Sequence, residues 1–230
     1  MGGVTEPGPL IGSGRTADVF DLGDGTVLRR YRQDRDVADE ARVMSAAADA
    51  GIPVPHVLRA QGRDLVLEFL PGSTLLAQLL EGARSADDVA DILIELIRLV
   101  GATPAARVLP GAPDGLVLVH HDLHPDNVMV TARGPVLIDW DGARAGSEGE
   151  DLAHLIVLLA GAVSDPAADL AVARVAGLLA LAVLARCSPP RDELLAEAAA
   201  ERESIPGFTA STALELARRW VRGITLTHRL

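Results

Sequence analysis

The 230-residue sequence contains little of three kinds of residue on which particular classes of protein depend. It has a single cysteine, Cys187, which excludes an intramolecular disulfide and any zinc site built from several cysteines. Aromatic residues make up only 3% of the chain, so a core must be built mainly from aliphatic side chains. Basic residues are outnumbered, with 21 Lys plus Arg against 32 Asp plus Glu, and the net charge of −11 argues against a nucleic-acid-binding surface.

Long apolar runs are also missing. The longest are residues 152–163, which a histidine interrupts, and residues 175–185, and both are too short to cross a bilayer. The first ten residues, MGGVTEPGPL, have neither the basic region nor the apolar stretch of a signal peptide. We therefore expect a soluble protein of the reducing cytoplasm that binds neither a membrane nor nucleic acid.

The amino-terminal third of the sequence is typical of short strands separated by glycines. Residues 17–22 and 26–31 have the composition of strands and are joined by Gly23-Asp24-Gly25, a strong hairpin signal. Residues 34–50 then show the apolar spacing of a helix, and residues 65–70 form a further apolar strand.

The sequence PGST, residues 71–74, breaks the chain after that strand. We expect a boundary there between an amino-terminal nucleotide-binding lobe, residues 1–70, and a carboxy-terminal helical lobe, residues 71–230. Three short strands are predicted in the second lobe, at residues 116–119, 128–130 and 135–138. Residues 151–222 are predicted to be helical, with breaks at three proline-containing segments.

The polar segment HHDLHPDN, residues 120–127, lies between two of these strands. It contains Asp122 and Asn127, and Asp139 ends the strand in VLIDW twelve residues after Asn127. A loop followed by a β-hairpin would bring the three side chains together, and their oxygens are the ligands that Mg²⁺ prefers. The alternative, that they are ordinary polar turn residues, is disfavoured by their combined spacing.

Three histidines in this segment, His120, His121 and His124, raise the alternative of a zinc site. Nothing downstream completes a familiar spacing of zinc ligands, so zinc is disfavoured. We expect these histidines to serve structural packing instead.

HHDLHPDN followed by LIDWD is similar to the catalytic loop and metal-binding motif of the aminoglycoside phosphotransferase and choline kinase family. Members of that family are small-molecule kinases, and the resemblance extends over residues 10–159. It implies an α+β, protein-kinase-like fold of two lobes, the first small and β-rich and the second mainly helical. It also implies an Mg²⁺-dependent transfer of the γ-phosphate of ATP or GTP to a hydroxyl group of a small molecule.

The resemblance assigns roles within the two motifs. Asp122 resembles the catalytic aspartate that accepts or orients the proton of the acceptor hydroxyl. Asn127 and Asp139 resemble the two Mg²⁺ ligands. Asp151 resembles the acid that braces the catalytic loop, through the backbone near His120.

The same resemblance implies a nucleotide site on the first lobe. Its residues are Gly12, Ser13, Gly14, Arg29, Glu40, Glu68 and Leu70. The first three lie in IGSGRTADVF, which resembles the loop that covers ATP phosphates, and the last two resemble the hinge that meets adenine. Arg29 stands where protein kinases carry the phosphate-binding lysine, and Glu40 resembles its acidic partner. No glycine-rich sequence ends in Gly-Lys-Ser or Gly-Lys-Thr, so the chain is not a P-loop enzyme.

The acceptor molecule is left open by the resemblance, because the family includes kinases of aminoglycosides, choline, sugars, amino acids and macrolides. An aminoglycoside or another amino-alcohol is an expected acceptor, because a net acidic protein attracts cations. An aminoglycoside or other antibiotic as acceptor would imply antibiotic resistance. The acceptor site is expected along the helices of residues 151–222, with Trp140, Trp220 or acidic side chains as candidate contributors.

Two other functions stay open as alternatives. One is a pseudokinase, a nucleotide-binding module with little or no transfer activity, which is suggested by Arg29, by Ala17 in place of a third glycine and by a short second lobe. The presence of Asp122, Asn127 and Asp139 argues against it. A protein kinase is disfavoured, because only eleven residues separate Asp139 from Asp151 and leave little room for a peptide-docking segment.

Overall fold

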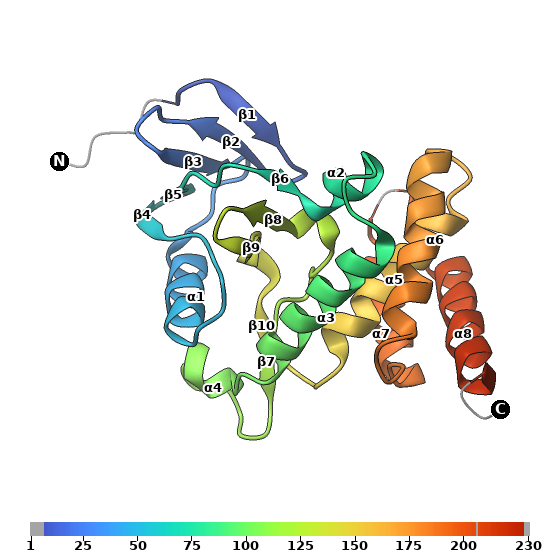
Figure 1. The fold of residues 1–230 in the computed structure, drawn as a ribbon. Helices are drawn as coiled ribbons and strands as arrows, with labels where there is room; N and C mark the ends of the chain where they lie inside the picture. Colours follow the sequence, from blue (N-terminus) through green and yellow to red (C-terminus); the bar gives the residue numbers. More distant parts are fainter. Residues whose placement is uncertain (1–6, 206, 228–230) are drawn as a thin grey trace.

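The structure, a computed structural model, describes residues 7–205 and 207–227, and its amino-terminal part is an antiparallel sheet of five strands (Figure 1). The strands are β1 (Leu10–Ser13), β2 (Ala17–Asp21), β3 (Thr26–Tyr31), β4 (Val57–Gln61) and β5 (Asp64–Glu68). They lie in the order β1-β2-β3-β5-β4. The predicted hairpin joins β2 and β3, and both of its glycines, Gly23 and Gly25, have a positive φ that other residues rarely adopt.

Helix α1 (Ala38–Asp49) follows β3 and brings Glu40 into the buried side of the sheet. It begins four residues later than the predicted start at residue 34. The reason is tertiary, because the N–H of Val37 donates to the carbonyl of Gly62 (2.9 Å) in the turn between β4 and β5. Residues 34–37 therefore connect β3 to α1 without regular secondary structure.

Two small sheets follow after residue 70. One contains β6 (Ser73–Thr74), β8 (Val128–Thr131) and β9 (Gly134–Leu137), and the other pairs β7 (Val117–Val119) with β10 (Arg144–Gly146). The predicted strands are therefore present as β7, β8 and β9, with β8 and β9 as the expected hairpin. Sequence patterns did not predict β1, β4, β6 or β10, which are short or exposed.

Helices make up most of the remaining chain. They are α2 (Leu75–Leu80), α3 (Ala86–Gly101), α4 (Ala105–Val108), α5 (Glu150–Ser164), α6 (Leu170–Leu184), α7 (Asp192–Arg202) and α8 (Ala210–Thr227). The helical prediction for residues 151–222 is confirmed, although the third predicted break includes residue 206, which lies outside the described residues. Among the helices described, none is both long and apolar enough to span a membrane.

Helix α5 is the centre of the helical part, because α6, α7 and α8 all pack against it (Figure 1). Ten of its fifteen residues are buried, including the polar Glu150, Asp151 and His154. The first turn of this helix is therefore held rigidly by packing, and its buried polar side chains can bind nearby loops.

The five-stranded sheet ends at Glu68, and β6 begins at Ser73 in a different sheet. A second connection joins the two parts, because the N–H of Leu137 donates to the carbonyl of Pro53 (2.8 Å). The functional division of the chain at residue 70 stays a prediction.

Gly72 lies in the connection between the two sheets, with a φ of +148°, and a Cβ there would meet the carbonyl oxygen of Val130 at 2.0 Å. We expect Gly72→Ala to lower the free energy of unfolding by about 2–4 kcal/mol, because the backbone on one side must move. Gly62→Ala is the control. Gly62 also has a positive φ but has no atom within 4 Å of the added Cβ, so we expect a loss of about 1 kcal/mol. Urea unfolding measures both, and equal losses would contradict the close approach.

Candidate active site

The loop that carries Asp122 runs from β7 to β8 and is held at its start by Asp151, in the first turn of α5. The N–H of His120 donates to Asp151 Oδ2 (3.0 Å), and the N–H of His121 donates to Oδ1 (2.7 Å). Burial raises the pKa of Asp151 to about 6, although the two N–H donors act in the opposite direction. Asp151 thus contacts the backbone of His120, as the resemblance predicts, and also that of the next residue, His121.

Two residues near this loop adopt backbone conformations that non-glycine residues rarely adopt. His121 has a φ of 73° and Asp139 a φ of 64°, and they are the only non-glycine residues with positive φ among those described. Each such conformation costs roughly 1–3 kcal/mol, and such strain is concentrated at functional sites in proteins. The two strained residues therefore both point to the loop and the end of the β8–β9 hairpin as a candidate functional site.

His120 connects the start of the loop to the segment after β9. Its Nε2 lies 3.1 Å from the carbonyl oxygen of Ile138, and its Nδ1 accepts from the N–H of Asp122 (3.4 Å). These contacts require a neutral ring with the proton on Nε2. Burial lowers the pKa of His120 to about 4, consistent with that neutral form.

Trp140 lies beneath His120, with the two rings edge to face at 4.7 Å. Its side chain is fully buried, and its indole N–H donates to the carbonyl of Leu137 (2.9 Å). Trp140 is therefore part of the core under the loop, and the expectation that it borders the acceptor site is wrong. Trp220, on α8, packs against the core.

Asp122 itself is surrounded by donors. Arg202 Nη2 donates to its Oδ1 (2.8 Å), while His124 Nε2 and Asn127 Nδ2 each lie 3.3 Å from its Oδ2. The N–H of Asp126 donates to His124 Nδ1 (3.3 Å), so Nε2 is the nitrogen that donates to Asp122. Burial would raise the pKa of Asp122, but the contacts with His124 and Arg202 outweigh it and hold that pKa well below its usual range.

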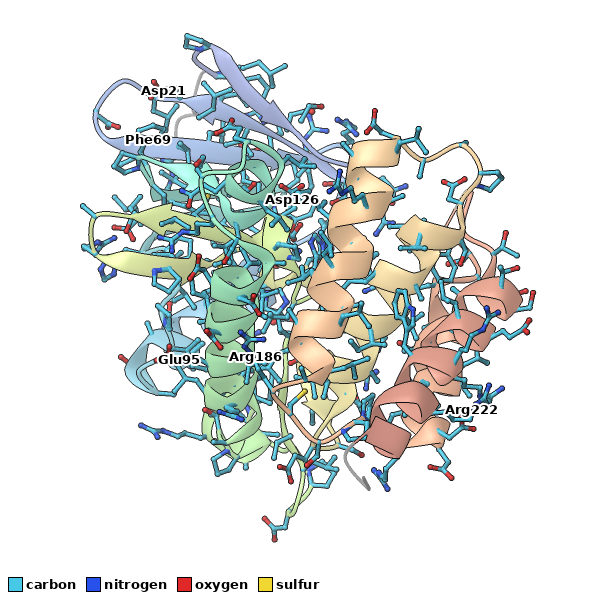
Figure 2. The ribbon with its side chains drawn as sticks, turned by 45° about the vertical axis from the view of Figure 1, so that its right-hand side comes forward. Asp21, Phe69, Glu95, Asp126, Arg186 and Arg222 are labelled. Carbon is cyan, nitrogen blue, oxygen red and sulfur yellow. The ribbon has the colours of Figure 1, made fainter. Side chains whose placement is uncertain are left out.

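The side of the loop that carries Asp126, which Figure 2 labels, lies against helix α2. Asp126, in the 3-10 helix η1 (Pro125–Asn127), accepts from Thr74 Oγ1 (2.9 Å). Thr74 is the N-cap of α2. The loop is therefore attached to the protein on both of its sides.

Asn127 and Asp139 are brought together by the β8–β9 hairpin. The N–H of Ile138 donates to the carbonyl of Asn127 (2.9 Å), which sets Asp139 beside Asn127. The amide NH₂ of Asn127 donates to the carbonyl of Asp122 (2.9 Å), so its Oδ1 is the atom available to a cation. The Asp139 side chain is 40% exposed. A carboxylate and an amide oxygen so arranged fit a Mg²⁺ ion, which takes oxygen ligands and keeps part of its water shell.

Arg29 links this pair to the five-stranded sheet. Its Nη1 lies 3.2 Å from Glu40 Oε1, and its Nη2 contacts Asp139 Oδ1. Tyr31 donates its hydroxyl to Glu40 Oε2 (2.7 Å), so both oxygens of that buried carboxylate have a partner. All 21 basic residues of the chain are arginines, so no lysine exists to take the place of Arg29.

The Gly12–Gly14 segment forms the end of β1 and the turn into β2. The N–H of Gly14 donates to the carbonyl of Ala17 (2.9 Å), and the hydroxyl of Ser13 donates to Asp18 Oδ1 (2.7 Å). Neither glycine has a positive φ. The contact of this turn with nucleotide phosphates stays a prediction.

Glu68 ends β5, just before the connection to the second half of the chain. Its N–H donates to the carbonyl of His56 (3.0 Å), and its side chain pairs with Arg133 (2.7 Å). A contact between adenine and the backbone of Glu68 would therefore have to use the carbonyl oxygen. The contacts predicted for Glu68 and Leu70 stay predictions.

Sequence patterns missed the polar groups that the end of α7 brings to the loop. Arg202 contacts Asp122, and Glu201 contacts His121, in both cases across 80 residues of sequence. Neither residue belongs to a motif, and the helical spacing of α7 gives no sign that its last turn meets the loop. A contact prediction from homologous sequences is the kind of signal that would find them.

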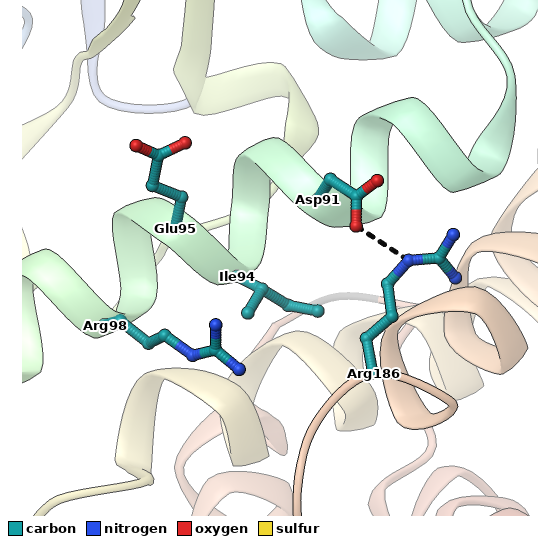
Figure 3. Close-up of a pocket in the computed structure, with 5 residues that line it drawn as sticks. All are labelled: Asp91, Ile94, Glu95, Arg98 and Arg186. Carbon is teal, nitrogen blue, oxygen red and sulfur yellow. Dashed lines mark hydrogen bonds and ion pairs between the residues drawn. The ribbon is translucent and has the colours of Figure 1, made fainter.

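A hollow on another face does not belong to this site. It lies between α3 and the residues after α6 and is lined by Asp91, Ile94, Glu95, Arg98 and Arg186 (Figure 3). Arg186 closes one end of it by pairing with Asp91 (2.7 Å). None of the residues described above lines it.

Comparison with known proteins gives a family and a fold. The sequence model of the phosphotransferase enzyme family (APH) matches residues 8–114 and 102–194. No curated protein matched in sequence.

Several solved structures are similar along almost the whole chain. Aminoglycoside phosphotransferase APH(4)-Ia has a TM-score of 0.52 at 16% identity, over 93% of this chain and 92% of that one. The gentamicin–APH(2")-IIa complex has a TM-score of 0.54 at 11% identity, over 93% and 90%. A thermostable APH(4)-Ia mutant in ternary complex with AMP-PNP and hygromycin B has a TM-score of 0.52 at 15% identity, over 93% and 92%. The predicted α+β, protein-kinase-like fold is thereby confirmed.

The buried, neutral His120 makes stability depend on pH. Its pKa is about 4 in the folded chain, against about 6.5 for an unfolded histidine, so the unfolded chain binds more protons between these values. The neutral His120 therefore makes its full contribution to the free energy of unfolding above about pH 6.5, and this contribution is lost as the pH falls towards about 4.

We expect the difference in unfolding free energy between the wild type and His120→Gln to shrink by about 2–3 kcal/mol from pH 7 to pH 4. Asp151, whose raised pKa acts in the opposite direction between about pH 4 and 6, is present in both proteins. Urea unfolding at several pH values measures the difference. A difference that does not change with pH would contradict a neutral His120.

Proposed function

The chain belongs to the phosphotransferase enzyme family, and on this premise we propose that it transfers the γ-phosphate of ATP or GTP to a hydroxyl group of a small molecule. One observation carries the proposal. Asp122, whose pKa is held low by His124 and Arg202, accepts from Asn127, one of the two proposed Mg²⁺ ligands, and keeps one position open for a hydroxyl donor.

The open position follows from counting lone pairs on Asp122. A carboxylate has four lone pairs. Among the described residues, Arg202 donates to one lone pair of Oδ1, and His124 and Asn127 donate to the two lone pairs of Oδ2. One lone pair of Oδ1 is left, and the side chain is 36% exposed. An acceptor hydroxyl that donates to it would be oriented for attack on the γ-phosphate.

The lowered pKa of Asp122 defines the kind of help that it gives. A weak base removes little of the proton before the transition state and accepts it as the new bond forms. That suits phosphoryl transfer, whose transition state is loose and asks the protein mainly for positioning and charge neutralisation.

Mg²⁺ would be held by the side-chain oxygens of Asn127 and Asp139, and when bound it would neutralise charge on the phosphate oxygens. Arg29 would hold the phosphates from the other side, with Glu40 fixing its direction. Gly12, Ser13 and Gly14 would cover the phosphates, and Glu68 and Leu70 would meet adenine. In this proposal residues 1–70 bind the nucleotide, and residues 71–230 carry Asp122 and the acceptor.

Aminoglycosides are the first acceptor class to test. Two proteins of the same fold are named in complex with hygromycin B and with gentamicin. The groups next to Asp122 are of mixed sign, with Arg202 and Arg144 opposed by Glu201, so charge alone does not select a polycation. Other amino alcohols, sugars, amino acids and macrolides belong in the same panel.

The test is the release of ADP from ATP, and of GDP from GTP, with Mg²⁺ and each member of the acceptor panel. We expect release that depends on one acceptor class and is about 10²- to 10⁴-fold slower in Asp122→Asn, which keeps the shape but loses the charge. No acceptor-dependent release from the wild type, with nucleotide still bound, would favour a nucleotide-binding module instead.

Binding and transfer should separate between two variants. Asp122→Asn should bind the Mg²⁺ nucleotide as the wild type does, because the nucleotide meets other residues. Asp139→Asn should bind it at least about tenfold more weakly, since a metal ligand loses its charge. Calorimetric titration with a non-hydrolysable ATP analogue measures both affinities, and equal affinities would show that the division of roles is wrong.

Arg29 uses two nitrogens to reach Glu40 and Asp139 at once, which the single nitrogen of lysine cannot do. We expect Arg29→Lys to raise the KM for nucleotide about tenfold or more and to leave the KM for the acceptor unchanged. Arg30→Lys is the matched control, because Arg30 grips Asp64 with two nitrogens elsewhere on β3. A similar rise of the nucleotide KM in both variants would mean that any such change in β3 weakens nucleotide binding, and that Arg29 has no special part in it.

A further inference from the structure

A second group of side chains that could hold a metal ion includes the residue next to Asp122. It consists of His121 on the loop, His154 on α5 and Glu201 in the last turn of α7, each offering one ligand atom within 4.8 Å of the others. His121 Nε2 contacts Glu201 Oε2, and His154 Nε2 lies 3.5 Å from the same oxygen. One carboxylate oxygen is thus shared by two imidazoles.

His154 is the residue whose surroundings call for a further partner. It is only 3% exposed, and its Nδ1 has no hydrogen-bond partner. Its other nitrogen has only the 3.5 Å contact with Glu201, at the outer limit of a hydrogen bond. Buried polar atoms normally have partners, so the loosely held Nε2, which lies towards Glu201, is the atom of His154 that an ion would engage.

We propose that His121, His154 and Glu201 bind one divalent transition-metal ion, with Zn²⁺ as the ion whose chemistry fits best. Two imidazole nitrogens and one carboxylate oxygen, with water in the fourth position, form a ligand set that zinc adopts in proteins. Bonds of about 2.0–2.2 Å in a tetrahedral arrangement separate ligand atoms by about 3.3 Å. The distance of 3.5 Å between His154 and Glu201 is close to that value, and the shorter His121–Glu201 contact would open as an ion enters.

The neighbours of the group complete the site. Arg144 Nη2 lies 3.2 Å from the other oxygen of Glu201 and holds the carboxylate in direction, while its Nη1 pairs with Glu150 (3.1 Å), which offsets the arginine charge. Glu201 is 43% exposed and His121 is partly exposed, so an ion can enter from solvent and reach His154 behind them. Mg²⁺ would not compete, since it prefers oxygen ligands.

The ion would connect three elements, the loop, α5 and α7, through one side chain from each. His121 is next to Asp122 on the loop, and Glu201 is next to Arg202, which donates to Asp122. A bound ion would therefore fix the end of α7 against the loop and keep Arg202 in reach of Asp122. This site is separate from the phosphate chemistry proposed above, and its binding can be measured without any acceptor or nucleotide.

The experiment is a calorimetric titration of the metal-free chain, prepared without an added histidine tag, with Zn²⁺. Co²⁺ serves as a second probe because its visible absorption reports tetrahedral nitrogen and oxygen ligands. We expect one ion per chain, a Tm that rises by several degrees with Zn²⁺, and no such response to Mg²⁺.

Two variants and one control decide the outcome. Glu201→Gln, on a half-exposed position, and His154→Gln should each weaken Zn²⁺ binding at least about tenfold, with circular dichroism confirming that both are folded. His56→Gln removes an exposed histidine elsewhere and should bind as the wild type does. Zn²⁺ binding that is absent from the wild type, or that both variants keep unchanged, would overturn the proposal.

Discussion

Asp151 accepts hydrogen bonds from two successive N–H groups of the loop that carries Asp122, and the directions of the polar groups in the candidate site depend on that contact. The carboxylate belongs to the first turn of α5, where the helix dipole favours negative charge. Because α6, α7 and α8 all pack against α5, the loop takes its position from the most buried helix of the protein. The strained φ of His121 is sustained by the same pair of hydrogen bonds.

The site combines support of short and of long range. Within the loop, His124 and Asn127 turn towards Asp122 because η1 brings their side chains back over the chain that precedes them. From outside, Arg202 reaches Asp122 from α7, and Arg29 reaches Asp139 from β3. The local contacts define the shape of the loop, while the distant ones connect it to the five-stranded sheet through Arg29 and to the helical part through Arg202.

Sequence patterns predicted the local part well. The spacing of Asp122, Asn127 and Asp139 predicted a loop and hairpin, and both are present, because strand and turn signals act over a few residues. The late start of α1 was missed, since it depends on a contact between Val37 and Gly62 that no local pattern records. Trp140 was misassigned for a related reason, because an aromatic residue beside a motif can point into the core as readily as into a pocket.

Arg29, the residue that we propose to hold the nucleotide phosphates, gives that proposed site a chemical property that follows from its guanidinium. In enzymes whose phosphate-binding residue is a lysine, that side chain is an amine, which acylating reagents modify and whose charge responds to its surroundings. A guanidinium stays protonated throughout the range in which proteins are folded. Nucleotide analogues that label a cleft by acylating its amine would therefore find no target at Arg29, and reagents that condense with guanidinium groups, such as dicarbonyl compounds, are the ones suited to this protein.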